Sequence, residues 1–116
     1  MTTPFIMGKD VNGMVDYDLP ISDTKYSATL TQGVSASVTA PRDAKQFKLF
    51  VVTEPGSTIW VAVNNTAASP VGSTFAATNS ELNPGPRLIN AGDTVSVLTT
   101  DITAQIEVSF YAVQQW

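Results

Sequence analysis

The stretch QFKLFVVTEPGSTIWVAVN, residues 46–64, has the pattern of two strands joined by a tight turn. In each half, apolar side chains recur at every second position, the period with which strand residues face opposite sides of a sheet. Between the halves, Pro55 and Gly56 occupy the two central positions that a type II turn favours. The stretch therefore predicts two consecutive strands whose inward-facing side chains are Phe47, Leu49, Val51, Ile59, Val61 and Val63.

The same alternation continues on both sides of this stretch. Residues 25–39 predict two strands, either as a hairpin or as consecutive strands, and residues 87–89, 94–99 and 104–113 predict three more. Residues 64–83, rich in Ala, Ser and Thr, predict an irregular segment with one or two short edge strands. No segment has a helical apolar face. About eight short strands joined by Gly, Pro and Asn turns predict an all-β fold, a jelly-roll or Greek-key β-sandwich.

The first 24 residues differ from the rest of the chain. No period of 2 or 3.6 persists there, although a short strand is expected at Met14–Tyr17. We therefore predict an extended N-terminal arm, residues 1–24, and a β-sandwich domain, residues 25–116. The arm is too apolar for a free tail, so we expect it to pack on its own sheet, with contact to a neighbouring molecule as the alternative. Its apolar side chains include Phe5, Ile6, Met7, Met14, Val15 and Leu19.

The composition excludes several classes of function. The chain of 116 residues has no Cys and no His, which excludes nucleophilic triads and standard zinc sites. A net charge of −4 with six Lys and Arg argues against binding to nucleic acid. No apolar run is long enough to span a bilayer, and the N-terminal residues lack the pattern of a secretory signal. We expect no cofactor and no metal, and synthesis in a cytoplasm.

The surface composition favours assembly. Charged residues make up 14% of the chain, against about 25% in an average soluble domain. Ser and Thr together contribute 25 residues, which suit pleated strands and close backbone contacts. Few long charged side chains are left to keep lone monomers apart. This composition indicates a protein that associates with others.

The most chemical-looking motif is the turn Asn90-Ala91-Gly92-Asp93. Asp93 and Asp101 are the best acidic candidates, but they stand at the two ends of one predicted strand, roughly 25 Å apart. Carboxylates that cleave a glycosidic bond must lie within about 10 Å of each other. We interpret the motif as a turn. Asn90 is expected either to adopt the left-handed backbone conformation or to cap the turn with its side chain. Gly92 is expected to take a positive φ, and Asp93 to accept hydrogen bonds from the backbone amides that follow it.

Three aromatic side chains are candidates for contacts with other molecules. Trp60 and Tyr111 lie on the faces opposite their strands' main apolar rows. They are therefore expected on the outer surface, at a subunit contact or beneath the arm. Trp116 stands at the last position, where a large ring finds little burial unless it packs against its own domain or a neighbour. A sugar-stacking platform is the alternative, but the polar side chains that normally accompany one are not identifiable.

Four sequence segments resemble those of small all-β virion proteins of tailed bacteriophages. They are VTAPRDAK, WVAVNNTAASPVGST, SELNPGPR and the pair GDTVSV and VSFY, within residues 34–113. The resemblance implies a jelly roll or sandwich that acts as a dimer or trimer, such as a capsid decoration (cement) protein or a fibre base or adaptor. It carries over no catalytic residue. The expected partner is the major capsid protein or another virion protein, on the capsid surface of a virion made in a bacterial cytoplasm.

We therefore expect a non-enzymatic decoration protein that binds the outside of a capsid, stabilises it and is homo-oligomeric. The alternatives are a carbohydrate-binding or adhesin module, a fibre or tail adaptor, and a hydrolase that uses only carboxylates. The predicted partner contacts are Phe5, Ile6, Met7, Met14 and Tyr17 in the arm, followed by Trp60, Tyr111 and Trp116.

Overall fold

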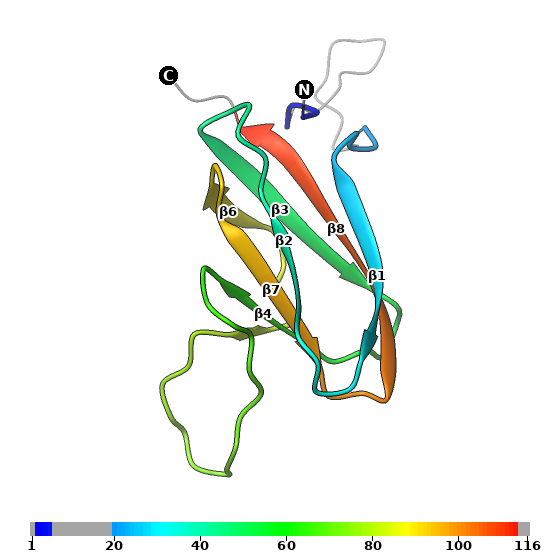
Figure 1. The fold of residues 1–116 in the computed structure, drawn as a ribbon, viewed down its shortest axis with the longest axis vertical. Helices are drawn as coiled ribbons and strands as arrows, with labels where there is room; N and C mark the ends of the chain where they lie inside the picture. Colours follow the sequence, from blue (N-terminus) through cyan, green and yellow to red (C-terminus); the bar gives the residue numbers. More distant parts are fainter. Residues whose placement is uncertain (1, 6–19, 114–116) are drawn as a thin grey trace, which may run out of the picture.

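The computed structural model describes residues 2–5 and 20–113, which form eight strands and no helix (Figure 1). The chain is all-β, as predicted from the period-2 alternation. The strands are β1 (Lys25–Thr31), β2 (Ala36–Thr39), β3 (Gln46–Thr53), β4 (Ile59–Val63), β5 (Glu81–Leu82), β6 (Arg87–Asn90), β7 (Thr94–Thr99) and β8 (Thr103–Val113).

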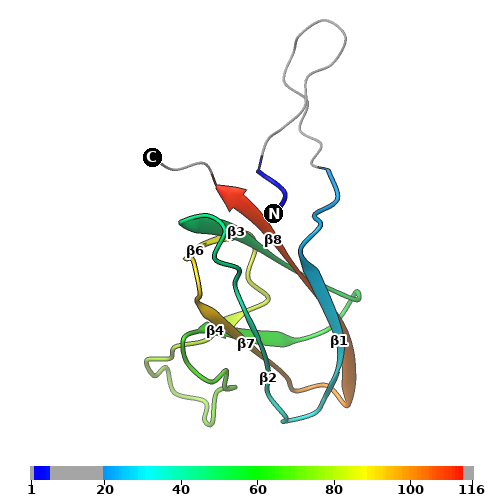
Figure 2. The same ribbon diagram turned by 45° about the horizontal axis from the view of Figure 1, so that its top comes forward.

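The strands form two four-stranded antiparallel sheets that face each other as a sandwich (Figure 2). One sheet has the order β1-β8-β3-β6 and the other the order β2-β7-β4-β5. Consecutive strands mostly lie in different sheets, so the residue 25–39 pair is two consecutive strands and not a hairpin. The turn at Pro55-Gly56 likewise carries the chain from β3 in one sheet to β4 in the other.

The pairing follows a simple rule along the chain. The first strand pairs with the last (β1 with β8), the second with the seventh, β3 with β6, and β4 with β5. Two further pairings, β3 with β8 and β4 with β7, join these ladders into sheets. The long β8 therefore lies in the middle of its sheet, and β1 lies at an edge.

The core lies between the two sheets. It is filled by the alternate side chains that the sequence placed inward, and Phe47, Leu49, Ile59 and Phe110 are almost completely buried. Val61 is buried too, while Val51 and Val63 are partly buried against the same cluster. Burial of one such side chain stabilises the fold by about 1.5–3 kcal/mol.

The turn at Pro55-Gly56 has the geometry that its sequence predicts. Gly56 has a φ of 83°, and the Ser57 amide donates to the Glu54 carbonyl at 3.2 Å. A longer connection joins β4 to β5 and extends away from the two sheets at the bottom of Figure 1. None of the described segments forms a helix with the length and apolarity needed to cross a membrane.

Candidate partner-binding surfaces

The described start of the arm is bound to its own domain. Residues Thr2–Phe5, here called the arm root, run parallel to the end of β8 beside Ala112. The Phe5 amide donates to the Ala112 carbonyl at 2.7 Å, and the Ala112 amide donates to the Thr3 carbonyl at 2.8 Å. The arm root thus continues the sheet along β8 just beyond the point where β1 begins. For these residues, packing on the same domain, which the sequence analysis preferred, is what the structure shows.

Phe5 covers an aromatic cluster on the outer face of this sheet. Its ring stacks on Phe50 with centroids 6.1 Å apart and meets the Tyr111 ring edge-on at 6.2 Å. The Lys48 ammonium lies 4.2 Å from the centre of the Phe5 ring, which is a cation–π contact. Tyr111 is only 8% exposed as a result. Of the three places open to Tyr111 from the sequence, the structure shows the one beneath the arm.

The chain returns to the same end of β8 after residue 19. The Tyr111 hydroxyl donates to the Pro20 carbonyl at 2.6 Å, and the Ser22 hydroxyl donates to the Phe110 carbonyl at 2.6 Å. Residues 6–19 therefore join two points that are both anchored near Phe110 and Tyr111. The predicted contacts Ile6, Met7, Met14, Tyr17 and Trp116, and the expected strand at Met14–Tyr17, lie outside the described residues.

Two carboxylates hold the arm root. Asp43 accepts hydrogen bonds from the amide and the hydroxyl of Thr2, the latter at 3.0 Å. The hydrogen bond from the Thr2 amide is the main cause that lowers the pKa of Asp43. Asp23 accepts from the Thr3 amide at 2.9 Å while its own amide donates to the Thr3 hydroxyl at 2.9 Å. Desolvation raises the pKa of Asp23, but the hydrogen bonds donated by Thr3 and Thr24 outweigh it and lower the pKa. Both acids therefore stay ionised near neutral pH and fix the arm root.

Trp60 lies on the outer face of the second sheet. Its neighbours along β4, Ile59 and Val61, point into the core, so the Trp60 side chain points away from it. In register with Trp60 are Leu98 on β7 and Leu82 on β5, and Leu82 is half exposed. These side chains form an apolar row across the sheet, so the outer surface is the place that the structure gives to Trp60.

A second exposed apolar feature is the connection between β4 and β5. Its base is fixed because the Ala67 amide donates to the Ser96 hydroxyl and the Ala68 amide to the Ser80 hydroxyl, both at 3.0 Å. Ala67 and Ser80 are buried, whereas every residue of 70–79 is exposed. We call residues 69–79 the finger loop. Within it, Val71 and Phe75 are 104% and 105% exposed, so these apolar side chains have almost no contact with their own domain.

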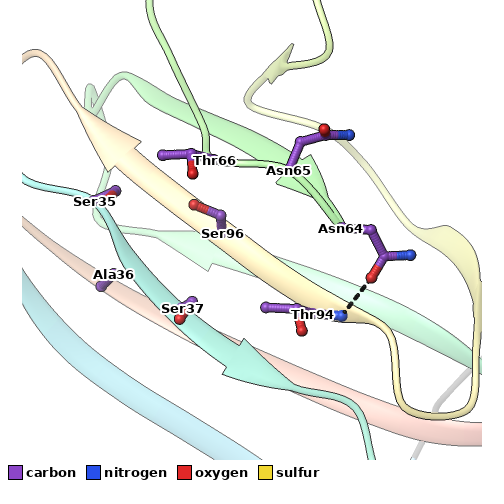
Figure 3. A pocket seen from close by; sticks show the side chains of 8 residues that line it. All are labelled: Ser35, Ala36, Ser37, Asn64, Asn65, Thr66, Thr94 and Ser96. Carbon is purple, nitrogen blue, oxygen red and sulfur yellow. Dashed lines mark hydrogen bonds between the residues drawn. The ribbon is translucent and has the colours of Figure 1, made fainter.

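A polar groove opens beside the base of the finger loop. Figure 3 shows its side chains, which are hydroxyls and amides except for Ala36, around a space of about 430 Å³. The Asn64 side-chain oxygen accepts from the Thr94 amide at 3.0 Å, and its amide group donates to Asp93 at 3.1 Å. The lining residues are Ser35, Ala36, Ser37, Asn64, Asn65, Thr66, Thr94 and Ser96.

The turn at residues 90–93 is a structural turn. Gly92 has a φ of 76°, as predicted, and a Cβ there would lie 2.6 Å from the Arg42 guanidinium. Asp93 accepts from the Asn90 amide at 2.8 Å. The prediction that Asp93 bonds the following amides is therefore wrong, because its carboxylate reaches back across the turn. Positive φ among the described non-glycine residues occurs at Asn64 and Asn83, so the left-handed alternative for Asn90 is wrong too.

Other acidic groups among the described residues also have structural partners. Asp101 accepts from the Thr58 amide at 2.8 Å, which ties the β7–β8 turn to the start of β4. Glu81 and Arg87 form an exposed ion pair at 2.7 Å, and hydrogen bonds from Arg87 lower the pKa of Glu81. Within residues 2–5 and 20–113, no three acidic side chains gather in a way that would hold a metal ion.

The finger loop was not predicted as a contact site. Residues 64–83 were predicted as an irregular segment with one or two short edge strands, and one such strand, β5, is present. A signal was present: Phe75 is the single aromatic residue in the long Ala, Ser and Thr segment. A lone aromatic side chain without alternating partners has no sheet face to occupy, and here it is exposed.

Comparison with protein-family models, with curated proteins and with solved structures found no match to the chain.

Proposed function

We propose that this chain is a non-enzymatic structural protein of a bacteriophage virion, a decoration protein that binds the outer surface of a capsid and stabilises it. The partner is the major capsid protein or a neighbouring virion protein. The sequence resemblance to small all-β virion proteins supports the proposal, and so does the all-β sandwich on which the contact surfaces stand.

The observation that carries the proposal is the finger loop. Val71 and Phe75 are fully exposed on a loop whose base is fixed by buried hydrogen bonds. Exposed apolar side chains grouped on a protrusion mark sites of contact with other proteins. Burial of Phe75 alone in a capsid pocket would contribute about 1.5–3 kcal/mol to binding. On a lattice that presents many copies of the same pocket, such modest contacts are multiplied when the decoration protein is itself oligomeric.

We further propose that the sandwich is a jelly roll. In that fold an antiparallel ribbon, which pairs the first strand with the last, wraps into two four-stranded sheets. The pairings β1 with β8, β2 with β7, β3 with β6 and β4 with β5 support this interpretation. A rigid body of this kind suits a protein whose role is to hold contact loops in fixed positions.

The proposed function is tested by co-sedimentation with capsids of the encoding phage that lack this protein. Wild-type protein is compared with the double variant Val71→Ser, Phe75→Ser, and the matched control is Ile102→Ser, an exposed apolar residue on the β7–β8 turn. We expect the wild type and the control to bind, and the double variant to lose about tenfold to a hundredfold in affinity.

The outcomes separate the parts of the proposal. If the wild type does not bind capsids, the decoration function is wrong. If the double variant binds as tightly as the wild type, the function stands but the finger loop is not the contact. If the Ile102→Ser control loses as much as the double variant, the effect belongs to surface hydrophobicity in general and not to the finger loop.

A second candidate function is carbohydrate binding, which the polar groove favours. Its hydroxyl and amide groups are the kind that bind sugar hydroxyls, and Trp60 lies half-buried on the outer face of the same sheet. Glycan-array binding that is abolished by Trp60→Ala or by Asn65→Ala would establish this function and contradict the decoration proposal. Absence of binding to any glycan would remove it.

A further inference from the structure

The four sheet edges of the sandwich are not alike. Three are formed by short strands: β6 and β2 have four residues each and β5 has two. The fourth edge is β1, with seven residues in an unbroken register with β8. No described residue forms a β-ladder with the side of β1 that faces away from β8. Natural proteins protect such edges with proline, bulges or inward-pointing charges, yet β1 has only Lys25 at its start.

The hydrogen bonds at its two ends show which backbone groups of β1 are free to pair. The Phe110 amide donates to the Thr24 carbonyl, and the Gln32 amide donates to the Ile102 carbonyl. In an antiparallel ladder the residues that bond to one neighbour alternate with those that point the other way. The even-numbered positions therefore face β8, and the backbone groups of Lys25, Ser27 and Thr29 point to the open edge. The Thr31 amide points the same way, while the Thr31 carbonyl accepts from the Val34 amide at 3.1 Å.

An apolar groove lies beside this edge. It has a volume of about 180 Å³ and separates β1 from β2, which is the edge of the other sheet. Tyr26 faces the interior and touches the Phe110 ring edge-on at 6.2 Å, but it is 49% exposed because the groove is open. Its apolar lining includes Tyr26, Ala28, Ala36, Val38, Val97 and Val108. The sandwich is therefore incomplete on the side where its strand edge is unprotected.

We propose that β1 pairs antiparallel with β1 of a second copy of this chain, about a two-fold axis at Ala28. This register places Ala28 opposite itself, Tyr26 opposite Leu30 and Ser27 opposite Thr29. It also places Lys25 opposite Thr31, so no like charges face each other. The residues that pair through hydrogen bonds are the odd-numbered ones, whose backbone groups, apart from the Thr31 carbonyl, point to the open edge.

The pairing joins the two β1-β8-β3-β6 sheets into one continuous sheet and brings the two grooves together. Tyr26 and Ala28 of both copies then become buried in a shared interior, which supplies apolar burial besides the backbone hydrogen bonds. A two-fold contact between identical patches closes at two copies. The inference rests on the self-association included in the proposed function, but not on capsid binding, and it selects a dimer over a trimer.

The test measures the mass of the purified full-length chain in solution, without capsids, by sedimentation velocity over about 1–100 µM. We expect twice the chain mass of 12.3 kDa. The variant Thr29→Pro removes an amide that points to the open edge and leaves the β8 ladder intact, so we expect a monomer. The matched control Thr29→Val keeps the amide and is expected to remain a dimer. Circular dichroism of both variants reports folding.

A disulfide provides a second measurement that does not depend on a proline in a strand. The chain has no Cys, so Ala28→Cys introduces a single thiol, which the two-fold axis places beside its own copy. We expect mild oxidation to cross-link Ala28→Cys at least about tenfold faster than Ser27→Cys, whose thiol faces Thr29 of the other copy.

Three results would overturn the inference. The first is a wild-type mass of one or three chains across the whole concentration range. The second is a dimer that persists unchanged in a folded Thr29→Pro variant. The third is cross-linking of Ala28→Cys no faster than that of Ser27→Cys. A dimer that fails to bind capsids would leave this inference intact and contradict only the decoration function.

Discussion

Replacement of Phe5 by alanine tests whether the arm root belongs to the folded domain. Phe5 is half-buried, so loss of its ring removes about 1 kcal/mol of apolar burial. The contacts with Phe50 and Tyr111 and the Lys48 ammonium add about another 1 kcal/mol. We therefore expect Phe5→Ala to lower the free energy of unfolding by about 2 kcal/mol, which lowers Tm by about 8 °C in a domain of this size.

The assay is equilibrium unfolding in urea, and the chain offers a matched control. Phe75→Ala makes the same chemical change at a side chain that is 105% exposed, so we expect its free energy of unfolding to stay within about 0.5 kcal/mol of wild type. If both variants lose the same stability, or if Phe5→Ala loses none, the reasoning about the arm root is refuted. Capsid binding should respond in the opposite order, with Phe75→Ala losing affinity.

Further predictions concern single contacts. Tyr111→Phe removes the donor to a partly buried carbonyl and should cost about 1–2 kcal/mol in urea unfolding; an unchanged midpoint would contradict that hydrogen bond. The stabilisation from Asp43, whose pKa is lowered in the fold, is complete above its ordinary pKa and is lost as pH falls through the folded value. Unfolding measured between about pH 6 and pH 2 should therefore show a loss of stability below about pH 4 that is smaller in Asp43→Asn. Gly92→Ala and Gly56→Ala should each destabilise by about 1 kcal/mol because both positions have a positive φ, and the exposed Arg42 guanidinium beside Gly92 can move aside; a much larger loss at Gly92 in urea unfolding would contradict that freedom of Arg42.

One further variant, with four substitutions, tests the predicted arm contacts, which lie outside the described residues. The combined substitution Ile6→Ser, Met7→Ser, Met14→Ser and Tyr17→Ser leaves the arm root unchanged. If these side chains contact a partner, capsid binding in co-sedimentation should weaken by at least about tenfold. Binding equal to that of wild type would remove the arm segment from the contact surface.

The strands could be predicted from the sequence because a local period determines them. One apolar side chain at every second position of residues 46–53 and 59–63 gives both the strand and its inward face. Pro55 and Gly56 fix the turn for an equally local reason, the backbone conformation that each residue favours. The all-β class follows from the sum of such local signals.

Strand order and the contact surfaces could not be predicted because long-range pairing determines them. Nothing within β1 indicates that it pairs with β8, about eighty residues away, and not with β2. The alternation along β8 correctly predicted that Tyr111 points away from the core. Its burial depends on Phe5, which the hydrogen bonds between Thr3 and Ala112 hold beside the Tyr111 ring. The arm root, Thr2–Phe5, is too short for its sequence to show a period. The exposure of Phe75 likewise depends on long-range structure, because no strand of the described part of the chain covers it.

Co-sedimentation with capsids that lack this protein tests the proposed function itself. We expect wild-type protein to pellet with the capsids, and the Val71→Ser, Phe75→Ser variant, equally stable in urea, to stay in the supernatant at concentrations that saturate the wild type. Wild-type protein that remains in the supernatant in the presence of excess capsids would contradict the account.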